Sequence, residues 1–284
     1  MKHLSFIIIL VFFASKIYSQ AEVPSSKEIA LFKKTTTYIV LDDSPFMTYN
    51  FKIKDAVKNS WKVTPYEFIS TSQFEDKRKD KKCSFISLDE VWFSKDKLKA
   101  QYNFLCLSLG GNYKNAKDMP QLCNVPVSYL GVEEDSYTYK LSALLQIIQD
   151  HISFVENTPG LSDINVKKKI NDNAYKIKNK ILYVIKDELS KSINTESKFS
   201  KIYPYKFKFV TRGVLEKAID GKEKGIVFLH KVGPEGTERK ARCYKTIIGT
   251  ENSKMYYFDY HMISSKKPDG LLEKDLKKIA NAKQ

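Results

Sequence analysis

The chain has 284 residues, of which 42% are hydrophobic and 13% aromatic, and this apolar content excludes an intrinsically disordered protein. Its formal charge is +15, but all except four of the 48 basic residues are lysines, spread along the chain beside Asp and Glu. Because phosphate and base recognition favour the bidentate arginine fork, the charge predicts solvated surfaces and excludes nucleic acid as a partner.

The chain begins with the three parts of an export signal. Lys2 and His3 form a basic start, an apolar run follows over 4–14, and a polar stretch over 15–20 ends it. The run is too short to span a bilayer as a helix, so a retained membrane anchor is the weaker alternative. We predict a signal peptide at 1–20 and a soluble mature chain that is periplasmic or secreted, with no transmembrane segment. No cysteine follows the run, which argues against a lipid anchor.

The first half of the mature chain predicts strands separated by helices. Runs of β-branched and aromatic residues between turn residues indicate strands, and apolar residues at helical spacing indicate helices. In chain order these are a strand at 37–43, a helix at 50–61, a strand at 64–70, a helix within 72–82, and strands at 85–93, 101–109 and 121–130. Ser94 to Lys97 form the expected hairpin turn, and Pro126 marks the last strand as an edge.

The strongest predicted helix lies in the middle of the chain, at 141–155. Its apolar residues form a single stripe: Leu141, Leu144, Leu145, Ile148, Ile152 and Val155. Such a stripe predicts a core helix between two domains, with a partner-binding helix as the alternative. Thr158-Pro159-Gly160 ends the helix and marks a linker.

The second half repeats the order of the first. It predicts strands at 182–188, 203–209, 227–230, 242–248 and 254–263, a weak helix within 190–202, and helices at 212–222 and 271–280. Gly221 is the expected C′ residue of the helix at 212–222. The turn at 233–236 closes a hairpin.

Similar motifs occur in similar order in the two halves, and chance similarity in a lysine-rich chain is the alternative. Thr37-Tyr38-Ile39-Val40 matches Leu182-Tyr183-Val184-Ile185, and Thr64-Pro65-Tyr66 matches Tyr203-Pro204-Tyr205. The predicted fold is therefore α/β (α+β): two related β-α-β-α-β-β-β domains with mixed sheets, helices on one face, and a central connecting helix. The boundaries are 21–135, 136–165 for the helix and linker, and 166–284.

Two resemblances follow from these motifs. The Tyr-Ser-Gln at the end of the signal, the Lys, Asn and Ile bias and the Thr-Pro-Tyr-Glu-Phe strand opening resemble exported proteins of the Bacteroidota that have no assigned activity. Val40-Leu41-Asp42-Asp43 in this strand order is similar to the N-terminal domain of the TolB family and its curli-secretion relatives. That resemblance covers strand order alone and implies a periplasmic assembly or interaction module rather than an enzyme.

Four cysteines, Cys83, Cys106, Cys123 and Cys243, are the first candidates for chemistry. Export would let disulfides persist, and four thiols allow three full pairings. We favour Cys106 with Cys123, which would pin the loop 110–122, because Cys83 lies diagonally from Cys106 across the predicted hairpin. Buried thiols are the alternative, with Cys106 and Cys243 at similar repeat positions. No C-x-x-C spacing or nearby His supports a metal site.

Asp259 and His261 share a predicted strand face and are the closest approach to acid/base machinery, with a surface or salt-bridged pair as the alternative. No nucleophile elbow, phosphate loop or cofactor motif accompanies them. The sequence therefore favours a non-catalytic binding or scaffolding protein of the cell envelope, with the groove between the copies as its site. The alternatives are an exported hydrolase using Asp259 and His261, and electrostatic attachment to an anionic envelope polymer.

Overall fold

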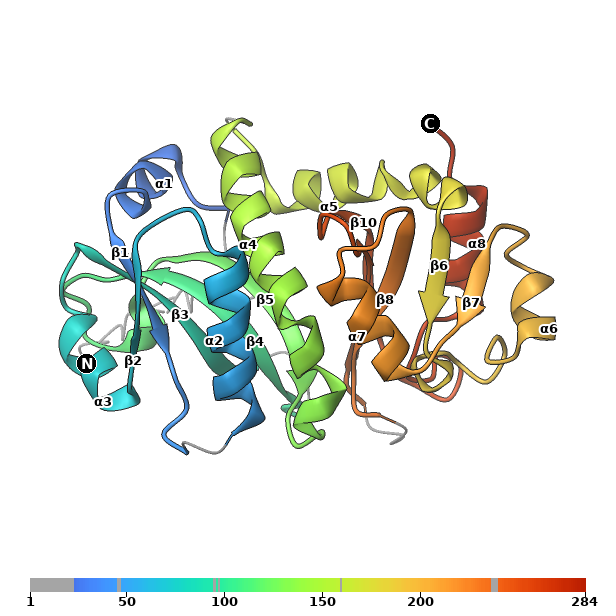
Figure 1. The fold of residues 1–284 in the computed structure, drawn as a ribbon, viewed down its shortest axis with the longest axis horizontal. Helices are drawn as coiled ribbons and strands as arrows, with labels where there is room; N and C mark the ends of the chain where they lie inside the picture. The colour runs from blue at the N-terminus through green and yellow to red at the C-terminus, as the bar shows by residue number, and fades with distance from the viewer. Residues whose placement is uncertain (1–22, 45–46, 94–95, 97, 159, 236–239) are drawn as a thin grey trace, which may run out of the picture.

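Two five-stranded mixed sheets lie side by side along the long axis of the molecule, with helices between and around them (Figure 1). The computed structural model describes residues 23–44, 47–93, 96, 98–158, 160–235 and 240–284. The predicted signal peptide at 1–20 lies outside these residues, as do most of the turn at 94–97 and the end of the turn at 233–236. Within the described ranges, no helix combines the length and apolarity needed to cross a membrane.

The first sheet has the strand order β2-β1-β3-β4-β5. Its strands are β1 Thr36–Val40, β2 Tyr66–Ile69, β3 Cys83–Trp92, β4 Gln101–Leu109 and β5 Gln121–Tyr129, and its helices are α1 Ser26–Phe32, α2 Thr48–Ser60 and α3 Thr71–Lys77. β1 runs parallel to β2 and β3, while β4 and β5 pair antiparallel. β5 is an edge strand, as Pro126 predicted.

The second sheet repeats this arrangement, with the order β7-β6-β8-β9-β10. Its strands are β6 Ile181–Val184, β7 Phe207–Phe209, β8 Ile226–Val232, β9 Arg242–Gly249 and β10 Met255–Met262, and its helices are α6 Glu196–Ser200, α7 Arg212–Asp220 and α8 Glu273–Asn281. β6 is parallel to both neighbours, and the hairpin strands follow antiparallel. Strand order and direction are the same in both halves, which confirms the predicted fold class.

The strand pairing corrects the correspondence between the two copies by two residues. Thr37 pairs with Tyr66 in the first sheet, and Leu182 pairs with Phe207 in the second. The Pro-containing motifs had placed the counterpart of Tyr66 two residues earlier. The cause is packing: Tyr203 is fully buried in the core beneath the second sheet, so β7 begins later after its proline than β2 does.

Helices cover both faces of each sheet, so the expectation of helices on one face was wrong. In β1, Ile39 packs toward α2, whereas Tyr38 packs with Phe74 of α3 on the opposite face. In β6, Tyr183 faces α7 and Leu182 faces α6. Successive residues of a strand point to opposite faces of the sheet. β1 and β6 are apolar on both faces, as is typical of parallel strands covered by helices on both sides.

The central helix α4, Leu141–Glu156, belongs to the cores of both halves. The apolar cluster that contains its stripe also includes Leu107 from the first sheet and Phe228 from the second. A second helix, α5 at Asp163–Asn171, follows and packs against β10. Sequence periodicity did not reveal α5, because its nine residues are mostly polar and Val166 and Ile170 make only a short apolar face.

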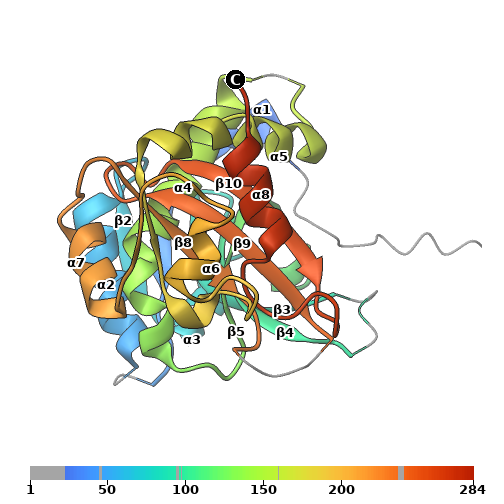
Figure 2. The same ribbon diagram turned by 90° about the vertical axis from the view of Figure 1, so that its right-hand side faces the viewer.

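Polar contacts also join the two halves. The ammonium of Lys52 on α2 lies 2.7 Å from Glu216 on α7, and these helices lie on the same side of the molecule (Figure 2). The buried guanidinium of Arg242 donates to both oxygens of Asp96, at 2.8 and 3.1 Å. The shared core and the buried pair of Arg242 with Asp96 join the two halves, and the partly exposed pair of Lys52 with Glu216 adds a contact between them.

Candidate functional site

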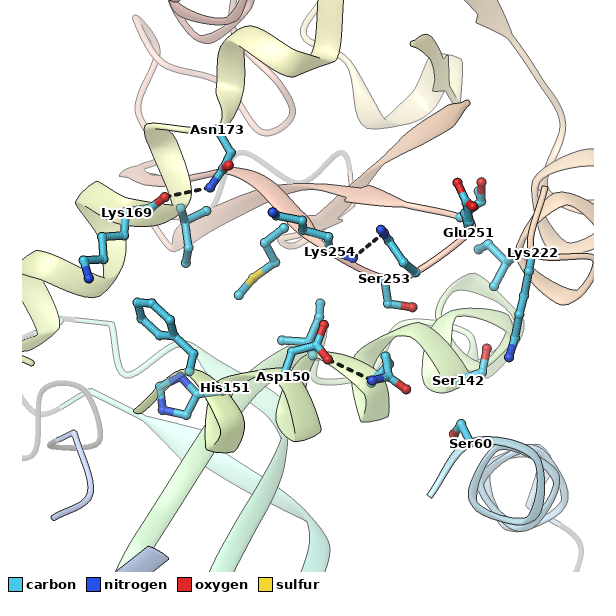
Figure 3. Close-up of a pocket in the computed structure, with 18 of the residues that line it drawn as sticks. Ser60, Ser142, Asp150, His151, Lys169, Asn173, Lys222, Glu251, Ser253 and Lys254 are labelled. Carbon is cyan, nitrogen blue, oxygen red and sulfur yellow. Dashed lines mark hydrogen bonds between the residues drawn. The ribbon is translucent and has the colours of Figure 1, made fainter. Parts of the chain in front are cut away.

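A groove of about 630 Å³ lies between the two halves, along α4 (Figure 3). One side is α4; the facing side is built from α5, the end of α7 and the turn between β9 and β10. Its position is the one expected for a site from the sequence, between the copies and beside the central helix. The volume is in the range that ligand pockets usually have.

The groove wall on α4 uses the face next to its apolar stripe. Ser142, Gln146, Asp150 and Phe154 line the groove, each one turn after the last. Since the stripe itself is buried in the core, these side chains are held at the margin between core and solvent. His151, which follows Asp150 on the same helix, also lines the groove.

Specific contacts fix the opposite wall. The side-chain amide of Asn171 on α5 accepts from the backbone N–H of Phe258 at 2.9 Å and donates to its carbonyl at 3.0 Å. Asn171 thus pairs with the edge of β10 as a neighbouring strand would. Lys167 adds an ion pair with Asp259 at 2.7 Å.

The groove differs in polarity from end to end. At one end, Val166 and Ile170 of α5 and Phe154 of α4 supply apolar lining, but the polar side chains of His151, Lys169 and Asn173 lie there too, and the ammonium of Lys169 is 5.2 Å from the centroid of the Phe154 ring (Figure 3). At the other end the lining is polar: Ser60, Ser142, Lys222, Thr250, Glu251 and Ser253. Figure 3 shows Lys222, Ser142 and Ser60 together at this end, with Asp150 and Lys254 in the middle.

The titratable groups in the groove are mostly cationic. Lys169, Lys222 and Lys254 form no ion pair with any described residue. Burial raises the pKa of Asp150, whose carboxylate accepts a 2.8 Å hydrogen bond from Gln146. Burial lowers the pKa of His151 to about 4, so its imidazole is neutral at neutral pH.

Asp259 and His261 lie on one face of β10, but each is bound to other groups. The carboxylate of Asp259 contacts Lys167 at 2.7 Å and Lys278 at 3.1 Å. Burial alone would raise the pKa of Asp259, but these two lysines outweigh it and hold the pKa well below its usual range. Neither Asp259 nor His261 lines the groove, and no hydrogen bond joins the pair among the described residues.

His261 belongs to a fully buried charged cluster that sequence reasoning missed. Lys245 lies 2.6 Å from Asp275 of α8 and 3.0 Å from Nδ1 of His261. Tyr257 donates to the other oxygen of Asp275 at 3.1 Å. Since the ammonium donates to Nδ1, Nε2 carries the proton and donates to the Pro268 carbonyl at 2.9 Å. The side chains of Lys245 on β9 and Asp275 on α8 are both 0% exposed, so their ion pair holds α8 against the second sheet.

A second buried group lies where the halves meet. His230 Nε2 is 2.8 Å from the carbonyl of Pro126 in β5, and Nδ1 is buried without a hydrogen-bond partner among the described residues. Burial and the nearby Lys140 ammonium lower the pKa of His230 to about 3. Lys140 is itself fully buried and lies 2.7 Å from Glu188. Sequence had placed His230 at the end of a strand, but β8 continues to Val232.

All four cysteines are buried free thiols in the structure, so the favoured pairing of Cys106 with Cys123 is not formed. Cys106 pairs across the strands with Asn124, whereas Cys123 pairs with Leu107. Side chains alternate along a strand, so the two thiols point to opposite faces of the sheet. Burial raises the pKa of Cys123 to about 12 and that of Cys106 well above its usual range, which leaves both thiols protonated.

The repeat positions of the cysteines also differ from the expectation. Val227 occupies in the second sheet the place that Ser84 has in the first. Ser84 pairs with Leu109, and Val227 pairs with Gly249, so Leu109 and Gly249 are counterparts. By this register Cys243 is the counterpart of Asn103 and not of Cys106. Among the described residues, no group of three or more His, Cys, Asp or Glu is placed to hold a metal ion.

Comparison with known proteins adds no relative. No family model, no curated protein and no solved structure matches the chain.

Proposed function

We propose that this is an exported, non-catalytic protein that binds a component of the cell envelope in the groove beside α4. The observation that carries the proposal is the groove itself: about 630 Å³ of lined space between two halves that a shared core holds together. The signal-like segment at 1–20 supports a periplasmic or secreted location, because its short apolar run is typical of export.

The walls of the groove support binding to a preformed site. The wall on α4 is supported by the core, and α5 is attached to β10 through the two hydrogen bonds of Asn171. A site whose walls are already ordered loses little conformational entropy when a ligand enters. Ligand pockets also combine apolar surface with a few polar groups, as this groove does.

The candidate acid/base pair supports binding rather than hydrolysis. Asp259 is neutralised by two lysines, and His261 has both ring nitrogens engaged by Lys245 and Pro268. A general base must be able to reach the proton of a bound substrate, and these contacts leave neither group free to do so. Within the groove, Asp150 and His151 are consecutive on a helix and do not face each other.

Affinity capture from the envelope extract of the source cell tests the proposal. The bait is the purified protein, compared with Gln146→Trp, which places a bulky ring in the middle of the groove. Asn281→Trp on α8, an exposed position that is not among the residues lining the groove, is the matched control. Mass spectrometry should find one component retained by the wild type and by Asn281→Trp and lost from Gln146→Trp. Retention by a correctly folded Gln146→Trp, judged by its circular dichroism and melting curve, would refute the groove as the site.

A further inference from the structure

The backbone at the polar end of the groove is unusual at Lys222. Two backbone hydrogen bonds close the last turn of α7. The N–H of Lys222 donates to the carbonyl of Ile219 at 3.1 Å, and the N–H of Glu223 donates to the carbonyl of Ala218 at 3.0 Å. This is a Schellman ending, in which the C′ residue adopts the left-handed conformation and is usually glycine. Here Gly221 has an ordinary φ of −74°, and Lys222 takes the left-handed position with a φ of 48°. The expected C′ glycine is therefore one residue too early.

A lysine in this conformation costs free energy that glycine would avoid. Strained non-glycine residues cluster where a side chain has a task. The described residues contain four with positive φ that are not glycine: Lys99, Lys222, Glu235 and Ser253. Lys222 and Ser253 both line the polar end of the groove. Two of the four strained positions therefore present an ammonium and a hydroxyl group at the same end of the groove.

The surroundings of Lys222 suit a negatively charged oxygen group. Its ammonium makes no ion pair with the described residues, and the hydroxyl of Ser142 lines the same end and is free to donate; those of Ser60 and Thr250 already donate to the carbonyls of Ala56 and Glu223. Carboxylates and phosphates accept hydrogen bonds from ammonium and hydroxyl groups alike. Glu251 lies at the same end as Lys222, but over the whole groove three lysines outnumber the two carboxylates of Asp150 and Glu251, so the net field favours an anion.

The opposite end suits a hydrocarbon chain. Phe154, Val166 and Ile170 supply its apolar lining beside the ammonium of Lys169, and Ile147 and Met255 add apolar surface to the groove. Contact with these side chains would remove apolar ligand surface from water, at about 25 cal/mol per Å² buried. A single ligand that satisfies both ends must be amphipathic.

From this polarity we infer that the groove binds an amphipathic anion, with its carboxylate or phosphate head at Lys222 and its hydrocarbon chain between α4 and α5. The inference rests on the proposed function and specifies its ligand. Lys222 is the residue that positions the head group, and the apolar end selects for a chain.

Calorimetric titration with three soluble probes tests this inference. Decanoate carries both features, decyltrimethylammonium has the same chain with the opposite charge, and inorganic phosphate has the charge without a chain. The variant Lys222→Gly removes the ammonium and relieves the backbone. Its matched control is Lys99→Gly, which removes the same charge at an exposed positive-φ position outside the groove.

Decanoate should bind the wild type and Lys99→Gly equally, and Lys222→Gly about tenfold more weakly, because a hydrogen bond to a charged group is lost. Both glycine variants should melt no lower than the wild type, which separates lost binding from lost folding. Decyltrimethylammonium and phosphate should bind much more weakly than decanoate.

Three results would overturn the ligand class: no decanoate binding, equal binding of the cationic probe, or full decanoate affinity in Lys222→Gly. Tight binding of phosphate alone would replace the amphipathic ligand by a free anion. Each of these results leaves the proposed function standing, because that fails only if Gln146→Trp retains the captured envelope component.

Discussion

Replacing Lys245 by methionine should destabilise the protein far more than the loss of an ordinary lysine. Lys245 and Asp275 are both at 0% exposure and 2.6 Å apart. Methionine fills much of the lysine volume but leaves the carboxylate of Asp275 buried without its counter-charge. Removing one partner of a buried pair typically costs about 3–5 kcal/mol of unfolding free energy. Tyr257 and the backbone of Leu272 still donate to Asp275, so the lower part of that range is expected.

Urea unfolding followed by far-UV circular dichroism measures this cost. The double variant Lys245→Met with Asp275→Leu should be more stable than Lys245→Met alone, because no unpaired charge remains in the core. Lys277→Met, which breaks the exposed pair with Glu273, is the control and should cost less than about 1 kcal/mol. Two results would refute the stabilising role of the pair: a cost below about 1 kcal/mol for Lys245→Met, or a double variant whose cost equals the sum of the two single costs.

Three further outcomes are expected. The folded-state pKa of His230 is about 3, below the ordinary value near 6.5, so the unfolded chain binds the proton first as the pH falls. Acidification from pH 6.5 to 3 should therefore lower the unfolding free energy by up to about 1.4 kcal/mol per pH unit through this group. In urea melts at several pH values, His230→Gln should lack this contribution. Equal pH slopes for the wild type and the variant would exclude a role of His230. The thiol reagent DTNB should react with no cysteine in the native protein and with all four in urea, whereas only two reacting would reveal a disulfide. Lys52→Ala should cost at most about 1 kcal/mol, since its pair with Glu216 is partly exposed; a larger loss in a double-mutant cycle would mean that this contact holds the halves together.

Local patterns predicted most of the helices and strands. The stripe that begins at Leu141 predicted α4 because helix periodicity and burial coincide there. The hairpin strands β9 and β10 were predicted because each is a β-branched and aromatic run between turn residues. The repeated order of motifs predicted two sheets of the same topology, which the strand pairing confirms.

The sequence could not predict features that depend on residues far apart in the chain. Lys245 and Asp275 meet across 30 positions, and neither residue differs locally from the many solvated lysines and acids around it. Tyr203 shifted the register of β7 through core packing that its Pro-containing motif does not encode. The groove was expected between the halves, but its polarity depends on α5 and on the conformation of Lys222, which only the folded chain reveals.

Methyl NMR of the protein with decanoate tests the central claim, that the groove beside α4 is the binding site, most directly. Selective labelling of isoleucine and methionine methyl groups places probes along the groove at Ile147, Ile170, Ile219 and Met255. These four methyl signals should shift together as decanoate is added, while that of Ile39, in the core of the first sheet, should not. Shifts confined to methyl groups outside the groove would contradict the groove as the binding site, and no shifts at all would contradict the amphipathic anion as its ligand.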